Sequence, residues 1–255
     1  MHPWAIFVEG LKNWRINWLK LAGIYLLIYI PLTVLDVLLT SKDGSPSLVQ
    51  MASGIIHWAL DAFVMASLIL SAKEHLNATV SKVMDTLKAS LKYLVRYMFT
   101  TLLYSVIAVG IVLLAAMVMS FLFTSLVKTP GITVGVLMAI IAMIACVAAV
   151  VYCVIRFSLS GIICIMEEVG PVESLKTSHS LIKKSVPSVL GVFFFMLLLT
   201  GLLFVPAILL NSVIVSNSAG SILSVIYQVL AGAVTFPVWV SVMVILYKRL
   251  KETVS

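Results

Sequence analysis

The stretch Val186–Leu209, VPSVLGVFFFMLLLTGLLFVPAIL, decides the fold, because it is apolar throughout and contains no charged residue. About 20 such residues suffice for a helix to cross the hydrocarbon core of a bilayer. The sequence therefore predicts an all-α, polytopic integral membrane bundle with about six transmembrane helices, in a single transmembrane domain covering residues 1–255. The five other apolar blocks are Leu19–Leu39, Gln50–Ala72, Tyr97–Leu126, Val134–Ile155 and Ile222–Tyr247.

The overall composition supports the same conclusion. Hydrophobic residues make up 62% of the chain and charged residues 11%, with a mean hydropathy of +1.17. Soluble domains average about 45–50% apolar and about 25% charged residues. So little charge cannot cover a globular surface, and lipid must surround most of the chain. Membrane topology accounts for the net charge of +7, so we expect no nucleic-acid partner.

The basic residues are distributed unevenly between the two sides of the predicted bundle. An even number of spans puts both termini on one side, and of the 17 Lys and Arg residues only Lys42 and Lys128 fall on the other side. Short cytoplasmic loops retain Lys and Arg. We therefore expect a multi-pass protein of the cell (cytoplasmic) membrane with both termini in the cytoplasm. Residues 248–255 would form a cytoplasmic tail, and the first span would be retained rather than cleaved.

A four-residue pattern of an acid, a small residue, Leu and Lys recurs before each odd-numbered span. Recurrence in a fixed order indicates internal repetition, here three pseudo-repeated hairpins that are each preceded by an amphipathic helix on the cytoplasmic surface. These helices are predicted at residues 1–18, 79–96 and 171–185. The pattern itself stands at Glu9–Lys12, Asp85–Lys88 and Glu173–Lys176.

The basic residues of these surface helices allow two interpretations. They either enforce topology and solvate the inner face, or form a collar that recognises anionic lipid headgroups, a protein partner or a second copy of the chain. Surface helices gain up to about 1 kcal/mol per basic side chain near a charged leaflet. The candidate contact residues are Lys12, Lys88, Lys92, Arg96, Lys176 and Lys183.

Asp61 lies midway along its span, and His57 precedes it by one helical turn on the same face. A charge at the bilayer centre costs at least about 2.5–3.5 kcal/mol. The two groups could relay a proton or bind a cation, as in a transporter, or take part in catalysis. Alternatively, Asp61 is protonated and links helices by a hydrogen bond. Asp36 is a weaker candidate, because it lies near the outer end of its span.

Arg156 ends the fourth span, but apolar residues continue to Met166. As one helix, Val134–Met166 would be about 50 Å long, more than the hydrocarbon core of about 30 Å. Either the helix projects into the cytoplasm and Arg156 reaches the lipid phosphates, or it bends near Gly161 and Arg156 lies inside the bundle beside an acid.

Motifs for catalysis are not found in the sequence. It contains no HExxH, GxSxG, paired-Cys or Gly-rich phosphate motif, so we expect a non-enzymatic protein with no cofactor and no metal. Cys146, Cys153 and Cys164 are interpreted as small buried hydrophobes.

The segment EVGPVESLKTSHSL at residues 168–181, followed by a span, resembles a signature of certain multi-pass families. These include the membrane domain attached to some glycerophosphodiester phosphodiesterases and related six-span bacterial and archaeal membrane proteins of unknown function. The chain's end, from Pro237–Trp239 to Leu246–Lys251, is similar to their final span. The resemblance implies a six-span fold and a membrane location. It does not imply hydrolysis, because the phosphodiesterase domain is lacking, and Thr177 stands where those families often have Arg.

These observations predict a protein that supports the transport or organisation of lipids, or of a partner complex. The alternative is a secondary or proton-coupled transporter that uses Asp61 and His57.

Overall fold

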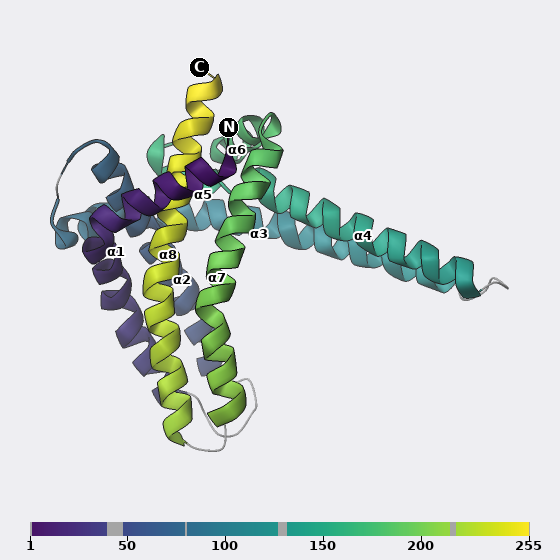
Figure 1. Ribbon diagram of the computed structural model, residues 1–255, viewed down its shortest axis with the longest axis horizontal. Coiled ribbons are helices and arrows are strands. Elements are labelled where there is room, and N and C mark those ends of the chain that lie inside the picture. The colour runs from purple at the N-terminus through teal and green to yellow at the C-terminus, as the bar shows by residue number, and fades with distance from the viewer. Residues whose placement is uncertain (1, 40–47, 80, 127–131, 215–217, 255) are drawn as a thin grey trace.

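The computed structural model describes residues 2–39, 48–79, 81–126, 132–214 and 218–254, and these residues form helices and no strand (Figure 1). The all-α class predicted from the sequence is confirmed. In chain order the elements are α1 (Pro3–Leu39), α2 (Leu48–Leu76), α3 (Val83–Leu126), α4 (Ile132–Phe157), α5 (Ser160–Met166), α6 (Pro171–Lys183), α7 (Val186–Ile214) and α8 (Ser218–Val254).

Six segments of the described chain are long and apolar enough to cross a membrane. Five of them lie within α1, α2, α3, α7 and α8, and the sixth, Met143–Met166, covers the end of α4 and all of α5. The predicted number of spans is therefore confirmed, and the chain is that of an integral membrane protein.

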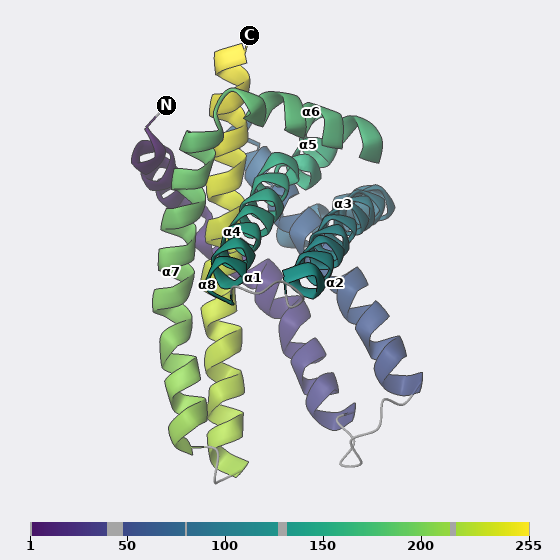
Figure 2. The same ribbon diagram turned by 90° about the vertical axis from the view of Figure 1, so that its right-hand side faces the viewer.

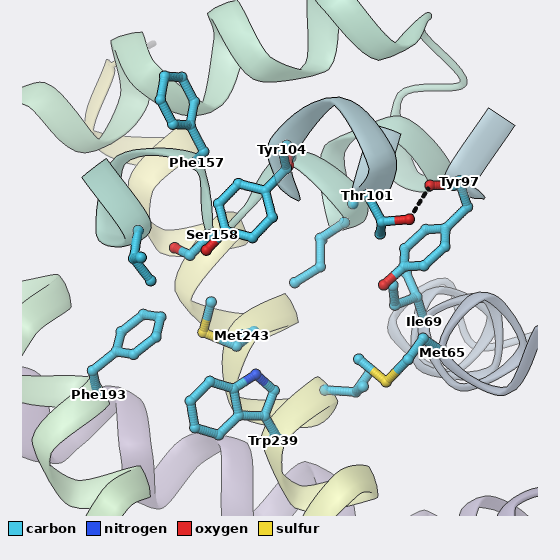
Figure 3. A pocket seen from close by; sticks show the side chains of 15 residues that line it. Met65, Ile69, Tyr97, Thr101, Tyr104, Phe157, Ser158, Phe193, Trp239 and Met243 are labelled. Atoms are coloured by element: carbon cyan, nitrogen blue, oxygen red, sulfur yellow. Dashed lines mark hydrogen bonds between the residues drawn. The ribbon is translucent and has the colours of Figure 1, made fainter. Parts of the chain in front are cut away.

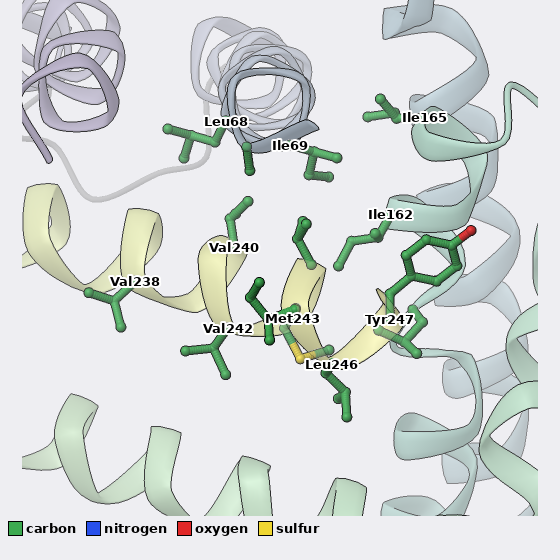
Figure 4. Packing of buried hydrophobic residues seen from close by; sticks show 14 of the residues in the cluster. Leu68, Ile69, Ile162, Ile165, Val238, Val240, Val242, Met243, Leu246 and Tyr247 are labelled. Atoms are coloured by element: carbon green, nitrogen blue, oxygen red, sulfur yellow. The ribbon is translucent and has the colours of Figure 1, made fainter. Parts of the chain in front are cut away.

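α8 is the central helix of the structure. In its most apolar stretch of 18 residues, 72% of the residues are buried, and α8 packs most extensively against α1. Figure 4 shows Val240 and Met243 of α8 among Leu68 and Ile69 of α2 and Ile162 of α5. Aliphatic side chains of three elements thus form one core around α8.

Both ends of the chain lie at one end of the molecule, together with α5 and α6 (Figure 1). We call this the basic end, because Lys73, Lys248 and Lys251 lie there. The first part of α1 crosses α7 and α8 there before the helix turns along the bundle. The crossing over α8 is close, because a Cβ atom added to Gly10 would lie 2.5 Å from Cγ2 of Val242. Only a residue without a side chain fits this contact.

The hairpin of α3 and α4 diverges from the other four long helices, which run side by side (Figures 1 and 2). No residue in the most apolar 18-residue window of α3 is buried. Most of the segment 79–96, predicted as a separate surface helix, forms the first part of α3, which continues without a break to Leu126. The segment contains no Gly or Pro that would end the helix there.

The chain does break at the end of α4. α4 ends at Phe157 and α5 begins at Ser160, so Val134–Met166 is not one helix. The structure thus agrees with the alternative in which the chain bends near Gly161. After α5, Gly170 and Pro171 start α6, with Pro in the first turn, where its missing N–H costs no hydrogen bond.

Candidate functional site

A cavity of about 250 Å³ lies where the α3–α4 hairpin leaves the rest of the bundle. Figure 3 shows Tyr97, Thr101 and Tyr104 of α3 on one side and Trp239 and Met243 of α8 on the other. Six helices, α2, α3, α4, α5, α7 and α8, and the break after α4 therefore contribute to one site. The remaining lining residues are Met65, Ile69, Val154, Phe157, Ser158, Ser160, Gly161, Ile162, Phe193 and Val240.

The lining is mainly apolar, and its polar side-chain groups are hydroxyls and the indole N–H of Trp239. The hydroxyls of Thr101 and Ser158 donate to the backbone oxygens of Tyr97 and Ile155, at 3.1 and 2.8 Å. They are thus engaged within their own helices. No acid, base or thiol lines the cavity among the described residues. A lining of this composition suits an apolar ligand.

Exposed apolar side chains continue from the cavity along the diverging helices. Val147 and Val151 of α4 share a helix face with Val154 of the lining and are 57% and 43% exposed, and Leu197 of α7, one turn from Phe193, is 64% exposed. The cavity is thus the narrow inner part of a wedge with apolar walls. In a bilayer the molecules that meet such walls are lipids.

Asp61, the clearest intramembrane candidate, is half-buried on α2 and accepts a hydrogen bond from the Tyr29 hydroxyl of α1. The ring of Tyr29 stacks on that of Tyr25, with centroids 4.2 Å apart. His57 lies one turn before Asp61 and is also half-buried. Tyr29 was not identified from the sequence, because nothing in its spacing relates it to a residue of another helix.

Arg156 lies inside the structure and is 6% exposed. Its Nη1 donates to the backbone oxygen of His179 in α6 at 3.1 Å, and its Nη2 contacts the hydroxyl of Tyr152. The hydroxyl of Ser178 donates to the backbone oxygen of Arg156 at 2.8 Å. Arg156 therefore joins α4 to α6. None of the ion pairs among the described residues includes it.

Two adjacent acids after α5 form hydrogen bonds and ion pairs with residues of three other helices. Glu167 accepts from the hydroxyl of Tyr247 at 2.6 Å and from Nζ of Lys251 at 2.7 Å. Glu168 accepts from the hydroxyl of Tyr93 at 2.8 Å and pairs with Lys73 at 3.5 Å. This acidic junction was not predicted, although two acids before Gly-Pro in a Lys-rich region are a usable signal.

The junction changes the acidity of both carboxyl groups. The hydrogen bond from Tyr93, followed by the charge of Lys73, lowers the pKa of Glu168. Burial raises the pKa of Glu167, but the hydrogen bonds from Lys251 and Tyr247 outweigh it, so this pKa is also lowered. Both groups are therefore more stable as carboxylates than in water.

The predicted collar residues divide into two groups. Lys92 pairs with Glu168 at 3.9 Å, and Arg96 donates to the backbone oxygen of Glu168, so both reach the acidic junction. Lys92 is nevertheless exposed, as are the other four, for which no side-chain contact is described: Lys12, Lys88, Lys176 and Lys183. The small residue of the four-residue pattern is buried in all three copies, and these residues are Gly10, Thr86 and Ser174.

A second hollow, of about 510 Å³, lies at the basic end between α2 and α8. Lys73, Lys248 and Lys251 line it, together with Glu252. Lys73 and Lys251 are already paired with Glu168 and Glu167. Much of its positive charge is therefore compensated by the protein itself.

The remaining candidates add no site. The side chain of Asp36 lies outside the described residues. Cys164 is fully buried, whereas Cys146 and Cys153 are partly exposed. Within the described parts of the chain, no group of three or more His, Cys, Asp or Glu residues could hold a metal ion.

Comparison of the chain with models of protein families, with curated proteins and with solved structures gives no match. The resemblance to the glycerophosphodiester phosphodiesterase membrane domain therefore stays a prediction, and the function must be argued from the site itself.

Proposed function

We propose that this is a non-enzymatic, lipid-handling protein of the cytoplasmic membrane that takes one acyl chain of a phospholipid into the cavity beside the α3–α4 hairpin. The apolar cavity at the inner end of the wedge carries the proposal. Its walls continue into exposed apolar side chains of α4 and α7, Val147, Val151 and Leu197, so a chain in the surrounding bilayer can enter without crossing water.

The charge distribution supports a lipid of the inner leaflet. The cavity reaches the break between α4 and α5, close to α6, and Lys176 and Lys183 lie exposed on α6. With both termini in the cytoplasm, as the basic loops favour, this end faces the anionic leaflet. A phospholipid there would place its chain in the cavity and its headgroup near the basic end.

The test uses the full-length protein in vesicles that contain a phosphatidylglycerol with a photoreactive diazirine in its acyl chain. Met243 is 2% exposed and lies on the inner wall of the cavity. We expect crosslinks at Met243 and Trp239, identified by peptide mass spectrometry. Lipids that only coat the outer surface cannot reach Met243.

A pair of variants on one helix supplies the control. Thr101→Trp fills the cavity and should remove the crosslinks at Met243. Val109→Trp, at a position that is 56% exposed two turns along α3, should leave them unchanged. Wild-type protein that is crosslinked only at exposed positions such as Val106 would refute the proposal.

The transporter alternative rests on the acid in the middle of α2. It needs water to reach Asp61 from at least one side, whereas a packed bundle keeps this position dry. Asp61→Cys, in a background without Cys146, Cys153 and Cys164, would be treated with a charged thiol reagent from each side. Labelling would favour the transporter, and absence of labelling from both sides would remove it.

A further inference from the structure

Arg156 is a buried cation without a protein counter-charge. It is 6% exposed, and its two polar contacts, the backbone oxygen of His179 and the hydroxyl of Tyr152, are neutral. Its Nε atom is buried and has no hydrogen-bond partner. Every ion pair among the described residues uses a different cation: Lys20, Lys73, Lys92, Arg249 or Lys251.

Such a burial is costly. Taking a guanidinium out of water costs several kcal/mol even after relaxation, and neutral acceptors offset only part of that cost. The unpaired Nε leaves a further donor unsatisfied. The guanidinium fits phosphate well, because its planar fork of donors matches two phosphate oxygens. The chemistry of the site thus calls for an anion with several oxygens.

The position of Arg156 relates this anion site to the cavity. Phe157, the next residue, lines the cavity, and its ring lies 6.0 Å from the ring of His179 in α6. In Figure 3 Phe157 points away from Trp239 and Phe193 on the opposite wall. The last turn of α4 therefore separates an apolar cavity from a buried cation, which matches the two parts of a phospholipid.

We infer that Arg156 binds the phosphate of an anionic phospholipid between α4 and α6, while an acyl chain of that lipid occupies the adjoining cavity. The inference rests on the proposed function for its acyl-chain half. Tyr152 covers the guanidinium, with its ring centroid 4.7 Å from Cζ, and is itself 45% exposed. A change of its side-chain rotamer opens Nε and Nη2 to the phosphate.

Native mass spectrometry of the full-length protein in detergent tests this site. Phosphatidylglycerol and phosphatidylcholine with identical acyl chains are added separately, and the retained fraction of each is measured. We expect the wild type to retain phosphatidylglycerol better. Arg156→Gln should reduce this preference about tenfold, as expected for the loss of one charge-assisted contact.

Two further variants make the result specific. Lys82→Gln removes an exposed positive charge just before α3, at a position outside the candidate headgroup contacts, and should leave the preference within about twofold of wild type, because exposed charges are screened. Arg156→Lys keeps the charge but not the planar fork, so it should fold even where the Gln variant does not, and should lose most of the preference. Equal losses in Lys82→Gln and Arg156→Gln would overturn the inference, and so would an unchanged preference in Arg156→Lys.

Competition with inorganic phosphate distinguishes a lipid ligand from a soluble one. If millimolar phosphate displaces phosphatidylglycerol from the wild type as effectively as excess lipid does, the site binds free phosphate and the inference fails. Failure of the cavity proposal looks different. Crosslinks at Met243 with no effect of Arg156→Gln on the preference would refute only the Arg156 site. Loss of the preference without crosslinks would refute only the cavity.

Discussion

Asp61 has an identified partner, and this partner bears on its role. The hydroxyl of Tyr29 donates to Asp61 from another helix, which is how polar groups link helices in membranes. A carboxyl group held in this way stabilises the contact between α1 and α2 without any flux of protons. The sequence left this interpretation open beside the transporter.

Substitutions of Asp61 and of Tyr29 should affect the stability of the protein differently. Asp61→Asn keeps an oxygen that accepts the bond, so its melting temperature in detergent should stay close to that of wild type. Tyr29→Phe leaves Asp61 without the donor and should destabilise the protein by about 1–3 kcal/mol. Melting measured by size-exclusion chromatography after heating provides the test. Equal stability of Tyr29→Phe and wild type would contradict the contact.

The acidic junction predicts a dependence of stability on pH. The pKa values of Glu167 and Glu168 are lowered in the folded state from the ordinary value of 4.5. Their contribution is therefore fully present above that pH and is lost as the pH falls through the lowered values. We expect the melting temperature to decrease as the pH falls below 4.5. The double variant Glu167→Gln, Glu168→Gln should show a flatter profile over this range, and an equally steep one would contradict the prediction.

Among the elements, α1 depends on the absence of a side chain where it crosses α8. A Cβ atom at Gly10 would lie 2.6 Å from the Cα atom of Val242, which is backbone and cannot rotate away. The amphipathic first part of α1 is thus packed onto the bundle and does not only lie on a membrane surface. The repeat that the sequence shows has a packing role in this copy, because its small residue occupies the contact.

Two glycines of α1 provide a matched comparison. Gly10→Ala should destabilise the protein by about 1–3 kcal/mol, the usual cost of overpacking. Gly23→Ala should be neutral or slightly stabilising, because an added Cβ meets nothing within 4 Å there and Ala is the better helix former. Thermal melting of the two variants side by side measures the difference. A Gly10→Ala protein as stable as Gly23→Ala would show that α1 can move away from α8 at no cost.

At the scale of the whole molecule, four long helices share one direction and the α3–α4 hairpin takes another (Figures 1 and 2). α8 and α2 contribute more residues to the core than any other helix, and 72% and 50% of their most apolar 18-residue stretches are buried. The hairpin contributes its first part and its end near Arg156 to the core. Its remaining length presents apolar side chains outward.

The orientation of the molecule in the membrane follows from its charges and can be measured. We expect Lys176→Cys to react with a charged thiol reagent only from the cytoplasmic side, and Lys42→Cys only from the other side. The native cysteines at 146, 153 and 164 are replaced in both variants. Three predicted spans separate the two positions, so reaction of both from the same side would contradict the predicted topology.

The six spans could be predicted because each apolar block is long enough by itself to require a membrane. The direction of the α3–α4 hairpin could not, since lipid-facing and core-facing side chains are equally apolar, and Val106 and Val240 look alike in a sequence. The partners of Asp61 and Arg156 were missed for a related reason: Tyr29 and His179 belong to other helices. The bend near Gly161 was among the alternatives, because the apolar stretch was too long for one span.

The length of α3 has a consequence for the bilayer itself. Its 44 residues extend about 66 Å as one helix, about twice the thickness of the hydrocarbon core. Together with α4 it leaves the axis of the other helices, so in a bilayer crossed by those helices we expect the cross-section of the protein to differ between the two leaflets. To follow this shape, the lipids beside it must tilt apart or the bilayer must become thinner, and this deformation has an elastic cost. We therefore expect this protein to favour curved or thin regions of membrane, where the bilayer is already deformed in the same sense.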